Sequence, residues 1–271
     1  MKGASRDSLA TARETLGTLL RAADSDLSTL GDELFDVMAL LDREKALRRA
    51  LTDAARTGDD RAGLARGVFA DQVGSATMDI LVWAVRARWS APRDLADAVE
   101  LLAVEATVAA AEKAGRLDSV EDELFRIGRI VAGSPDLRVA LADRSAPVDT
   151  RAALVEDLLG GKAADETRRL VRQAVVAPRG RSLDRTLQEY GRVAADRRSR
   201  LVAKVTATAP LTEEQRGRLG AALARIYGHE VQLNIEVDPA VIGGVRVEIG
   251  DEVIEGSVVS RLDDARRRLA G

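Results

Sequence analysis

The stretch Val237–Leu262, VDPAVIGGVRVEIGDEVIEGSVVSRL, combines a proline, two adjacent glycines, an alternating run and two further glycines. A phosphate-binding loop needs consecutive backbone amides aimed at one point, usually where a helix begins. Gly243-Gly244 instead lead into a run in which apolar and polar residues alternate, which is typical of a strand. We therefore expect these glycines to shape the backbone, as a bulge or a tight entry into a strand.

The residues on either side of this glycine pair predict a small α+β domain of order β-α-β-β-α over residues 200–271. Thr212 and Gln215 stand at capping-box spacing in its first helix. Gly250-Asp251 and Glu255-Gly256 fit turns. The predicted elements are a strand over 201–210 ending at Pro210, a helix over 211–228 ending at Gly228, strands over 231–237 and 245–249, and a closing helix capped by Ser257.

The chain from about Ser5 to Ala194 is predicted to be helical. Apolar residues recur there at steps of three and four, as in ATMDILVWAVRARW, and short segments with glycine or proline separate the periodic runs. Ser119 with Asp122 fits the cap of one helix, and Asp118 is the alternative cap. Alanine-rich helices with short connections favour a helical bundle.

An internal repeat divides this helical region. DELF occurs at Asp32–Phe35 and again at Asp122–Phe125, and the gapless offset of 90 matches Asp32–Phe69 to Asp122–Leu159 at 13 of 38 positions. Leu81-Val82 then align with Leu170-Val171 after a slip of one residue. Chance similarity between helices of like composition is the alternative explanation. The predicted fold is mainly α, a duplicated bundle followed by the α+β domain: residues 1–105, residues 106–199 and residues 200–271, with the alanine-rich segment ELLAVEATVAAAEKAG joining the two bundles.

The composition excludes several kinds of site. The chain has no cysteine and one histidine, His229, so thiolate sites and sites that need several imidazoles are excluded. The net charge is −3, acidic residues are mixed through the arginines, and aromatic residues make up 3%, all of which oppose a nucleic-acid groove. The N-terminus has no apolar signal core, and no run is long enough to cross a bilayer. We expect no catalytic residue, no cofactor-binding residue, no metal ligand and no direct membrane insertion.

The C-terminal region resembles the delta subunit of bacterial F-type ATP synthases, whose mitochondrial relative is the oligomycin-sensitivity-conferring protein. The region from GRLDSVEDELFRIGRIV to LQEYGRVAADRRSR is similar to the family's helical domain, and a second bundle resembles the extended delta subunits of actinobacterial enzymes. Glu255 departs from the family pattern, in which an aspartate is more usual. The residues that carry the resemblance are Leu233, Ile235, Val237, Asp238-Pro239, Ile242-Gly243-Gly244, Val245, Val247, Gly250, Val253-Ile254, Gly256-Ser257 and Leu262.

The resemblance implies a mechanical role. The family's subunit is a non-catalytic part of the peripheral stalk, which ties the catalytic head to the b-type stalk subunits and resists the torque of the rotor during ATP synthesis and hydrogen ion transport. It implies that the helical domain receives the N-terminal helices of the head's alpha subunits and that the C-terminal region meets the stalk. One copy per complex, at the cytoplasmic face of the bacterial plasma membrane, is expected. The second bundle is the candidate for the standard head contact, and the first would extend the stator.

Other classes of function are weighed against this one. An enzyme would need a nucleophile or an acid–base pair in a pocket, whereas the acidic residues fall at the spacing of solvated helix faces. A nucleic-acid-binding module could use the arginines, but the acidic balance and the few aromatic residues oppose it. A generic helical scaffold or adaptor protein is the remaining alternative. Helical bundles offer grooves that bind amphipathic helices. A scaffold and a stator subunit would both have such grooves, so the grooves do not distinguish the two.

Overall fold

In a computed structural model of the chain, residues 3–20, 26–199, 202–227, 231–238, 244–250 and 252–255 are described. The chain divides into two compact units, residues 1–194 and 195–271. The described residues form twelve helices and one four-stranded sheet, which confirms the predicted fold class. The first eleven helices are α1 (Ala4–Leu20), α2 (Leu27–Arg43), α3 (Lys45–Leu51), α4 (Gly58–Phe69), α5 (Ser75–Arg86), α6 (Pro92–Lys113), α7 (Leu117–Gly133), α8 (Pro135–Ala142), α9 (Val148–Leu159), α10 (Asp165–Val176) and α11 (Leu183–Ser199).

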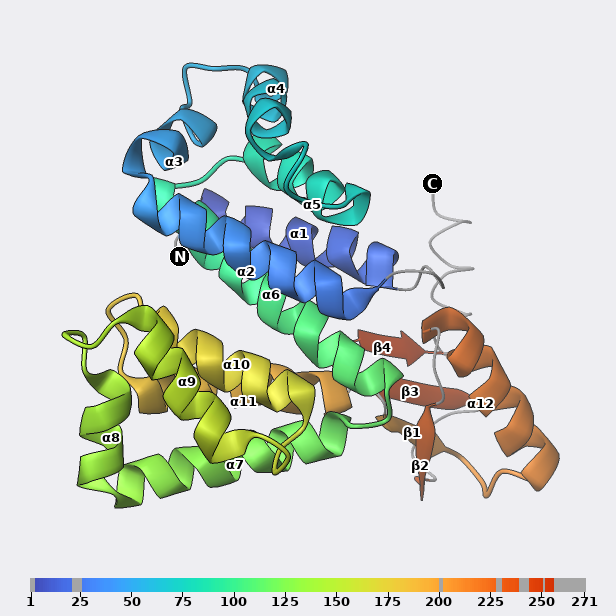
Figure 1. Cartoon of the computed structure of the whole chain (residues 1–271). Helices are drawn as coiled ribbons and strands as arrows, with labels where there is room; N and C mark the ends of the chain where they lie inside the picture. The colour runs from blue at the N-terminus through green and yellow to red at the C-terminus, as the bar shows by residue number, and fades with distance from the viewer. Residues whose placement is uncertain are drawn as a thin grey trace. The chain divides into compact units, whose positions relative to one another are not determined.

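The repeat in the sequence is also a repeat in the fold. Helices α2, α3, α4 and α5 each begin 90 residues before α7, α8, α9 and α10, respectively. Within each copy the last two helices pack side by side, α4 on α5 and α9 on α10 (Figure 1). We call α2–α5 the first copy and α7–α10 the second copy.

The same carboxylate contact fixes the helix register in both copies. The carboxylate of Glu33 accepts hydrogen bonds from the Gly74 amide, at 3.0 Å, and from the Thr77 hydroxyl. Ninety residues later, the carboxylate of Glu123 accepts bonds from the amide of Ala164, at 3.0 Å, and from the hydroxyl of Thr167, at 2.5 Å. In each case a carboxylate satisfies donors at a helix N-terminus, where negative charge is favourable. The predicted slip of one residue at Leu81-Val82 is therefore wrong, because the offset stays at 90 through α5 and α10.

The alanine-rich segment predicted to join the bundles is the second half of a buried helix. Its residues Leu102, Val104 and Val108 are fully buried, and α6 packs against α1, α2, α7 and α10 (Figure 1). Small residues allow the close approach: a Cβ atom added at Gly31 of α2 would lie 2.7 Å from Thr107 Oγ1. The predicted boundary between the bundles, after residue 105, falls inside this helix. The segment is core and not a linker.

The predicted cap of α7 is wrong. The helix begins at Leu117, and the amide of Val120 already donates to the carbonyl of Arg116, so Asp118 and Ser119 lie inside the first turn. No side chain caps this end. The buried side chain of Leu117 draws the helix start toward α6, through a turn in which Gly115 has a φ of +68°.

Apolar residues at matched positions form the cores of both copies. Leu34 and Leu51 of the first copy are buried, and so are their counterparts Leu124 and Leu141 in the second. The other matched leucines, Leu47, Leu64, Leu137 and Leu154, are half-buried. The pattern of burial therefore repeats along with the helices.

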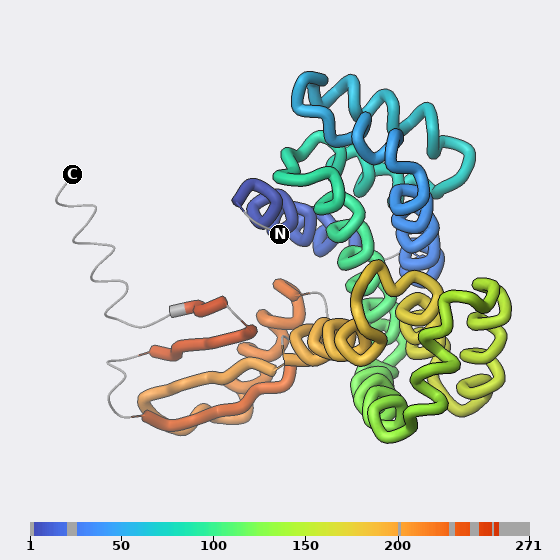
Figure 2. The backbone as a smooth tube through the Cα atoms, turned by 90° about the vertical axis from the view of Figure 1, so that its left-hand side faces the viewer, coloured from blue at the N-terminus to red at the C-terminus, as the bar shows by residue number. Residues whose placement is uncertain are grey.

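The described residues of the C-terminal unit form a mixed sheet covered by one helix. Its described elements are β1 (Val202–Ala207), α12 (Glu213–Tyr227), β2 (Gln232–Val237), β3 (Val245–Ile249) and β4 (Glu252–Glu255), and the strand order is β2-β1-β3-β4. Strand β1 pairs with β2 in parallel and with β3 antiparallel, and β3 pairs with β4 antiparallel (Figure 2). The core joins apolar residues of β1 and β3, such as Val205 and Val247, to Leu223 of α12.

The local predictions for this unit have mixed outcomes. The capping box of α12 is confirmed: the Thr212 amide donates to Gln215 Oε1 at 2.9 Å, and the Gln215 amide donates to Thr212 Oγ1 at 3.2 Å. Gly244, just before β3, has a φ of +94°, and Gly250 has a φ of +56°, so both glycines serve backbone geometry. The four-residue strand β4 was not predicted, and Glu255 lies in it and not in a turn. The predictions for Gly228, His229, Gly243, Asp251, Gly256 and Ser257 lie outside the described residues.

Candidate functional site

The described part of the chain contains neither a metal-binding cluster nor a helix that could span a membrane. Among residues 3–20, 26–199, 202–227, 231–238, 244–250 and 252–255, no cluster of three or more His, Asp or Glu side chains is suited to a metal ion. Across the same ranges, no helix combines the length and apolar character required to span a bilayer. Two other features stand out in the helical unit, a buried charged cluster and an exposed apolar surface.

The charged cluster forms around Arg179, in the loop between α10 and α11. Its guanidinium is buried and reaches three carboxylates: Asp42 of α2 at 3.0 Å, and Asp97 and Glu100 of α6, each at 2.7 Å. The same group donates to the backbone carbonyl of Ala96 at 3.3 Å. One side chain from the end of the second copy therefore holds the C-terminal turn of α2 and the first half of α6.

Glu100 is the second centre of this cluster. Its carboxylate is buried, accepts a hydrogen bond from the buried hydroxyl of Tyr190 at 2.7 Å and also pairs with Arg181. Arg181 continues the network to Glu189 of α11 at 3.0 Å. Burying a charged carboxylate is costly unless it is paired and hydrogen-bonded, and these partners meet that requirement for Glu100.

The surroundings change the proton affinity of these groups. Burial raises the pKa of Asp97, although Arg179 opposes the shift. Burial also raises the pKa of Tyr190 well above its ordinary value, and the neighbouring negative charge of Glu100 adds to the effect. For Arg179, burial favours deprotonation, but Glu100, Asp42 and Asp97 outweigh it and raise the pKa. The arginine is therefore charged at every physiological pH.

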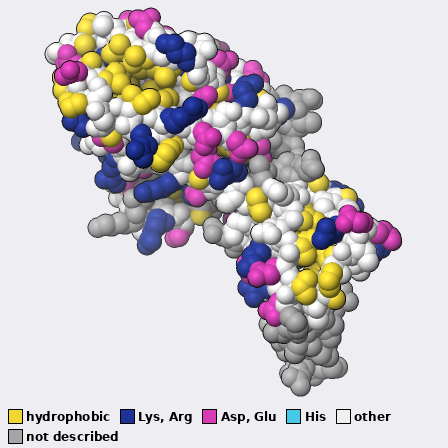
Figure 3. Space-filling view, turned by 90° about the horizontal axis from the view of Figure 1, so that it is seen from below, with side chains coloured by type: hydrophobic (Ala, Val, Ile, Leu, Met, Phe, Trp, Pro, Cys, Tyr) yellow, Lys and Arg dark blue, Asp and Glu magenta, His cyan; other side chains and the backbone are white. Residues whose placement is uncertain are grey.

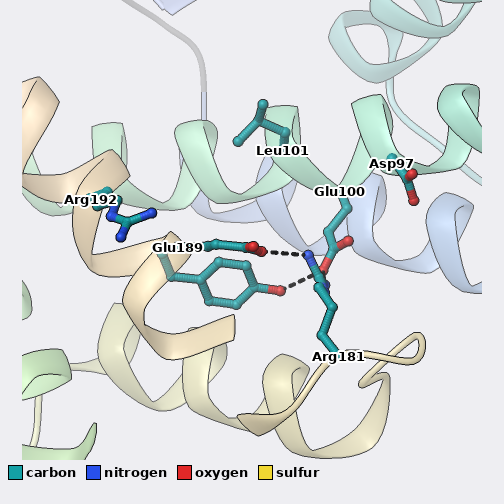
Figure 4. Close-up of a pocket in the computed structure, with 7 residues that line it drawn as sticks. Asp97, Glu100, Leu101, Arg181, Glu189 and Arg192 are labelled. Atoms are coloured by element: carbon teal, nitrogen blue, oxygen red, sulfur yellow. Dashed lines mark hydrogen bonds and ion pairs between the residues drawn. The ribbon is translucent and has the colours of Figure 1, made fainter. Parts of the chain in front are cut away.

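A cavity of about 280 Å³ opens beside this network (Figure 4). In Figure 4 the side chains of Glu100 and Arg181 point toward each other at its wall. The hydroxyl of Tyr190 also donates to Glu100. These groups bond one another, so their bonded polar atoms are not available to a molecule in the cavity. The arrangement therefore fits a structural role better than a catalytic one. Its polar lining residues are Asp97, Glu100, Arg181, Glu189, Tyr190 and Arg192.

The apolar surface lies on the second copy. Figure 3 shows apolar side chains gathered on one face of the helical unit, the face to which α7, α8 and α9 contribute. Within the described helical unit, all the large apolar side chains that are strongly exposed belong to these three helices. We call this set the α7–α9 apolar surface: Phe125, Ile130, Val139, Val148 and Leu158.

The two copies differ most clearly at one matched phenylalanine. Phe35 of α2 is 7% exposed, whereas Phe125 at the same position of α7 is 66% exposed. Helix α6 packs along α2 in the first copy. Arg129 lies over the Phe125 ring at 6.0 Å from its centroid. A large exposed aromatic group on a folded unit marks a candidate contact site.

Sequence reasoning missed both features. The acidic residues were expected on solvated faces, yet Glu100 is 3% exposed and Glu166 is 1% exposed. The signal for Glu100 was its place in the run AVELLAV, where every neighbour is apolar. The exposure of Phe125 left no such signal, because the surrounding motif DELF is the same in both copies.

Comparison with known proteins identifies the family. Residues 104–269 match the family model described as the ATP synthase delta (OSCP) subunit. The protein named ATP synthase subunit delta from Streptomyces avermitilis is 54% identical over 268 residues, covering 99% of this chain and 98% of the relative. The protein of that name from Streptomyces coelicolor is 52% identical over 270 residues, covering 100% and 98%.

The family model begins inside α6, so the first copy lies outside it, whereas these relatives extend across both copies. Among solved structures, a chain of the Toxoplasma gondii mitochondrial ATP synthase hexamer matches 62% of this chain and 95% of its own length, with 21% identity and a TM-score of 0.33. The family model and the full-length relatives suffice by themselves: the chain belongs to the ATP synthase delta (OSCP) subunit family.

Proposed function

We propose that the α7–α9 apolar surface is where this stator subunit receives the N-terminal amphipathic helices of the head's alpha subunits. As a member of the family, the chain is a non-catalytic peripheral-stalk subunit of the F-type ATP synthase. Because the chain belongs to this family, we set aside the alternatives of a generic scaffold and a nucleic-acid-binding module. The proposal adds which part of the helical region meets the head.

One observation carries the proposal: the strongly exposed large apolar side chains of the described helical unit all lie on the second copy. An amphipathic helix binds by placing its apolar face on such a surface, with anchor side chains at helical spacing. Phe125, 66% exposed, offers an aromatic group of the kind that often dominates binding energy. The first copy buries the matched residue, Phe35.

The remaining partners follow the family. We propose that the C-terminal unit meets the b-type stalk subunits, where Ile226, Val237, Val253 and Ile254 are exposed apolar contacts. One copy of the chain would serve each complex, at the cytoplasmic face of the plasma membrane, coupling ATP synthesis to hydrogen ion transport. The first bundle would extend the stator by a further contact on the head or along the stalk.

Titration of the full chain with a peptide of the alpha N-terminus tests the proposed head contact. The Phe125→Ser variant should weaken binding about tenfold or more, as loss of a central aromatic anchor does. A matched control is Arg49→Ser, which changes an exposed residue of α3 at the position that Val139 occupies in α8. If Phe125→Ser bound the peptide as tightly as the unmodified chain and Arg49→Ser bound it more weakly, the contact would lie on the first copy.

A further inference from the structure

The loop between α10 and α11 has an unusual backbone. Arg179 has a φ of +50°, in the left-handed region that residues other than glycine rarely adopt, and Gly180 follows with a φ of +83°. Such a conformation persists only where the surroundings determine it. Here the surroundings are the three carboxylates around the buried guanidinium, and Arg93 of α6 also donates to the carbonyl of Arg179.

The matched loop of the first copy has no such contact. Trp89 stands at the position of Arg179, and its indole donates to the carbonyl of Ala84 within its own copy, at 2.8 Å. Hydroxyl groups bind this loop to α1: Ser8 donates to the carbonyl of Arg88 at 2.7 Å, and Ser5 accepts from the Ser90 amide at 2.7 Å. The first loop docks on α1 and the second on α6, and the second also reaches the other copy, through the ion pair of Arg179 with Asp42.

The position of this contact matters for rigidity. The second copy is joined to α6 by the chain itself at one end, through the turn after Lys113. Arg179 contacts α6 near Asp97, about 24 Å away along the helix at 1.5 Å per residue. Helices α7 and α10 also pack on α6, and Arg179 adds to this packing a contact of fixed geometry at a point far from the chain connection. Arg169 of α10 adds an ion pair to Asp32 of α2, at 3.2 Å.

We propose that Arg179, with Asp42, Asp97 and Glu100, is a latch that fixes the orientation of the second copy relative to the first, so that the two move as one lever. A buried ion pair often adds little stability over apolar groups of similar size, but its geometry selects one arrangement. The latch therefore sets orientation more than it sets stability. This inference concerns the helical unit alone and does not depend on the proposed partners.

A distance measurement between the two copies tests the latch in the full chain. The chain contains no cysteine, so Gly63→Cys in α4 and Ala153→Cys in α9 give two unique spin-label sites. Both residues are exposed and lie at matched positions, 90 residues apart. With Arg179 intact, we expect one narrow distance distribution. In Arg179→Met, the narrow distribution should be lost and replaced by a broad one.

The matched control is Arg185→Met, which removes an exposed arginine of α11 paired with Glu189 at 2.9 Å. It should keep the narrow distribution. If Arg179→Met does not fold, Asp42→Asn removes the ion pair between Arg179 and α2, together with the longer pair of Asp42 with Arg48 at 3.6 Å, and it should broaden the distribution while Arg179 keeps its contacts to α6. A narrow distribution in a folded Arg179→Met chain, or in Asp42→Asn, would overturn the proposal. Equal broadening by Arg185→Met would do so too.

Discussion

The two helical copies have the same arrangement of helices but differ in which matched side chains are exposed. Glu33 and Glu123 accept matching bonds at the start of α5 and α10, and the helices begin 90 residues apart throughout. Phe35 and Phe125 occupy the same position, but one is buried and the other exposed. The duplicated helices thus share the contacts that set the fold, whereas the exposure of matched residues differs between the copies.

The N-terminal ends of α2 and α7 show the same divergence. Asp26 caps α2 by accepting from the amides of Ser28, at 3.1 Å, and Thr29, at 3.2 Å. Its counterpart in the second copy is Arg116, which cannot accept a hydrogen bond and instead pairs with Glu166 of α10, at 2.6 Å. A local cap in one copy has become a contact between helices in the other.

The matched phenylalanines give the largest expected difference. Phe35→Ala should lower the free energy of unfolding by about 3–5 kcal/mol, because it removes a buried aromatic ring from between packed helices. Phe125→Ala should change it by no more than about 0.5 kcal/mol, because the ring is mostly in solvent. Chemical denaturation of both variants measures the two values. Equal losses would show that Phe125 is buried in solution.

The matched carboxylates should behave alike. Glu33→Ala and Glu123→Ala should each lower the free energy of unfolding by about 2 kcal/mol. Each substitution leaves an amide and a hydroxyl at a helix N-terminus without their charged acceptor. Thermal or chemical unfolding of the two variants, measured in parallel, compares the costs. A large effect at one position only would mean that the copies do not share this contact.

The pair of Arg116 and Glu166 gives the smallest effect, and it should depend on pH. Burial opposes ionisation of Glu166, but the hydrogen bond and charge of Arg116 outweigh it, so the pKa of Glu166 lies below its ordinary value of 4.5. The ionised Glu166 carboxylate therefore stabilises the fold above about pH 4.5. This stabilisation is lost as the pH falls through the pKa that Glu166 has in the folded chain.

Glu166→Gln should therefore lower the free energy of unfolding at pH 7, by less than about 1 kcal/mol because Arg116 is half exposed. The difference from the unmodified chain should shrink below pH 4.5. Denaturant titrations at pH 7 and at pH 3.5 measure it. A difference that stays constant between these two values would contradict the assigned ionisation.

Much of the fold could be predicted from the sequence because periodicity and repeats are local signals. The offset of 90 residues, the Thr212–Gln215 capping box and the strand glycines all appear in short stretches of sequence. The role of α6 could not be predicted this way, because an alanine-rich run looks alike in a linker and in a tightly packed core helix. Its close packing uses Gly31, 76 residues before Thr107, because the missing side chain leaves room for Thr107.

The candidate sites were less accessible to sequence reasoning. The resemblance pointed to the second bundle for the head contact, but nothing in the repeated motif DELF distinguishes the exposed Phe125 from the buried Phe35. The latch joins residues from 42 to 179, and such a contact exists only once the helices have packed. Burial differs between identical motifs because their neighbours differ.

ATP-driven proton pumping tests the central claim, that this chain couples the catalytic head to the stalk. Membranes stripped of the chain should hydrolyse ATP without acidifying the vesicle interior, because an untethered head turns with the rotor. Adding back the purified full chain should restore pumping, and adding the Phe125→Ser chain should restore less at the same concentration. Normal pumping by membranes that lack the chain would contradict the account.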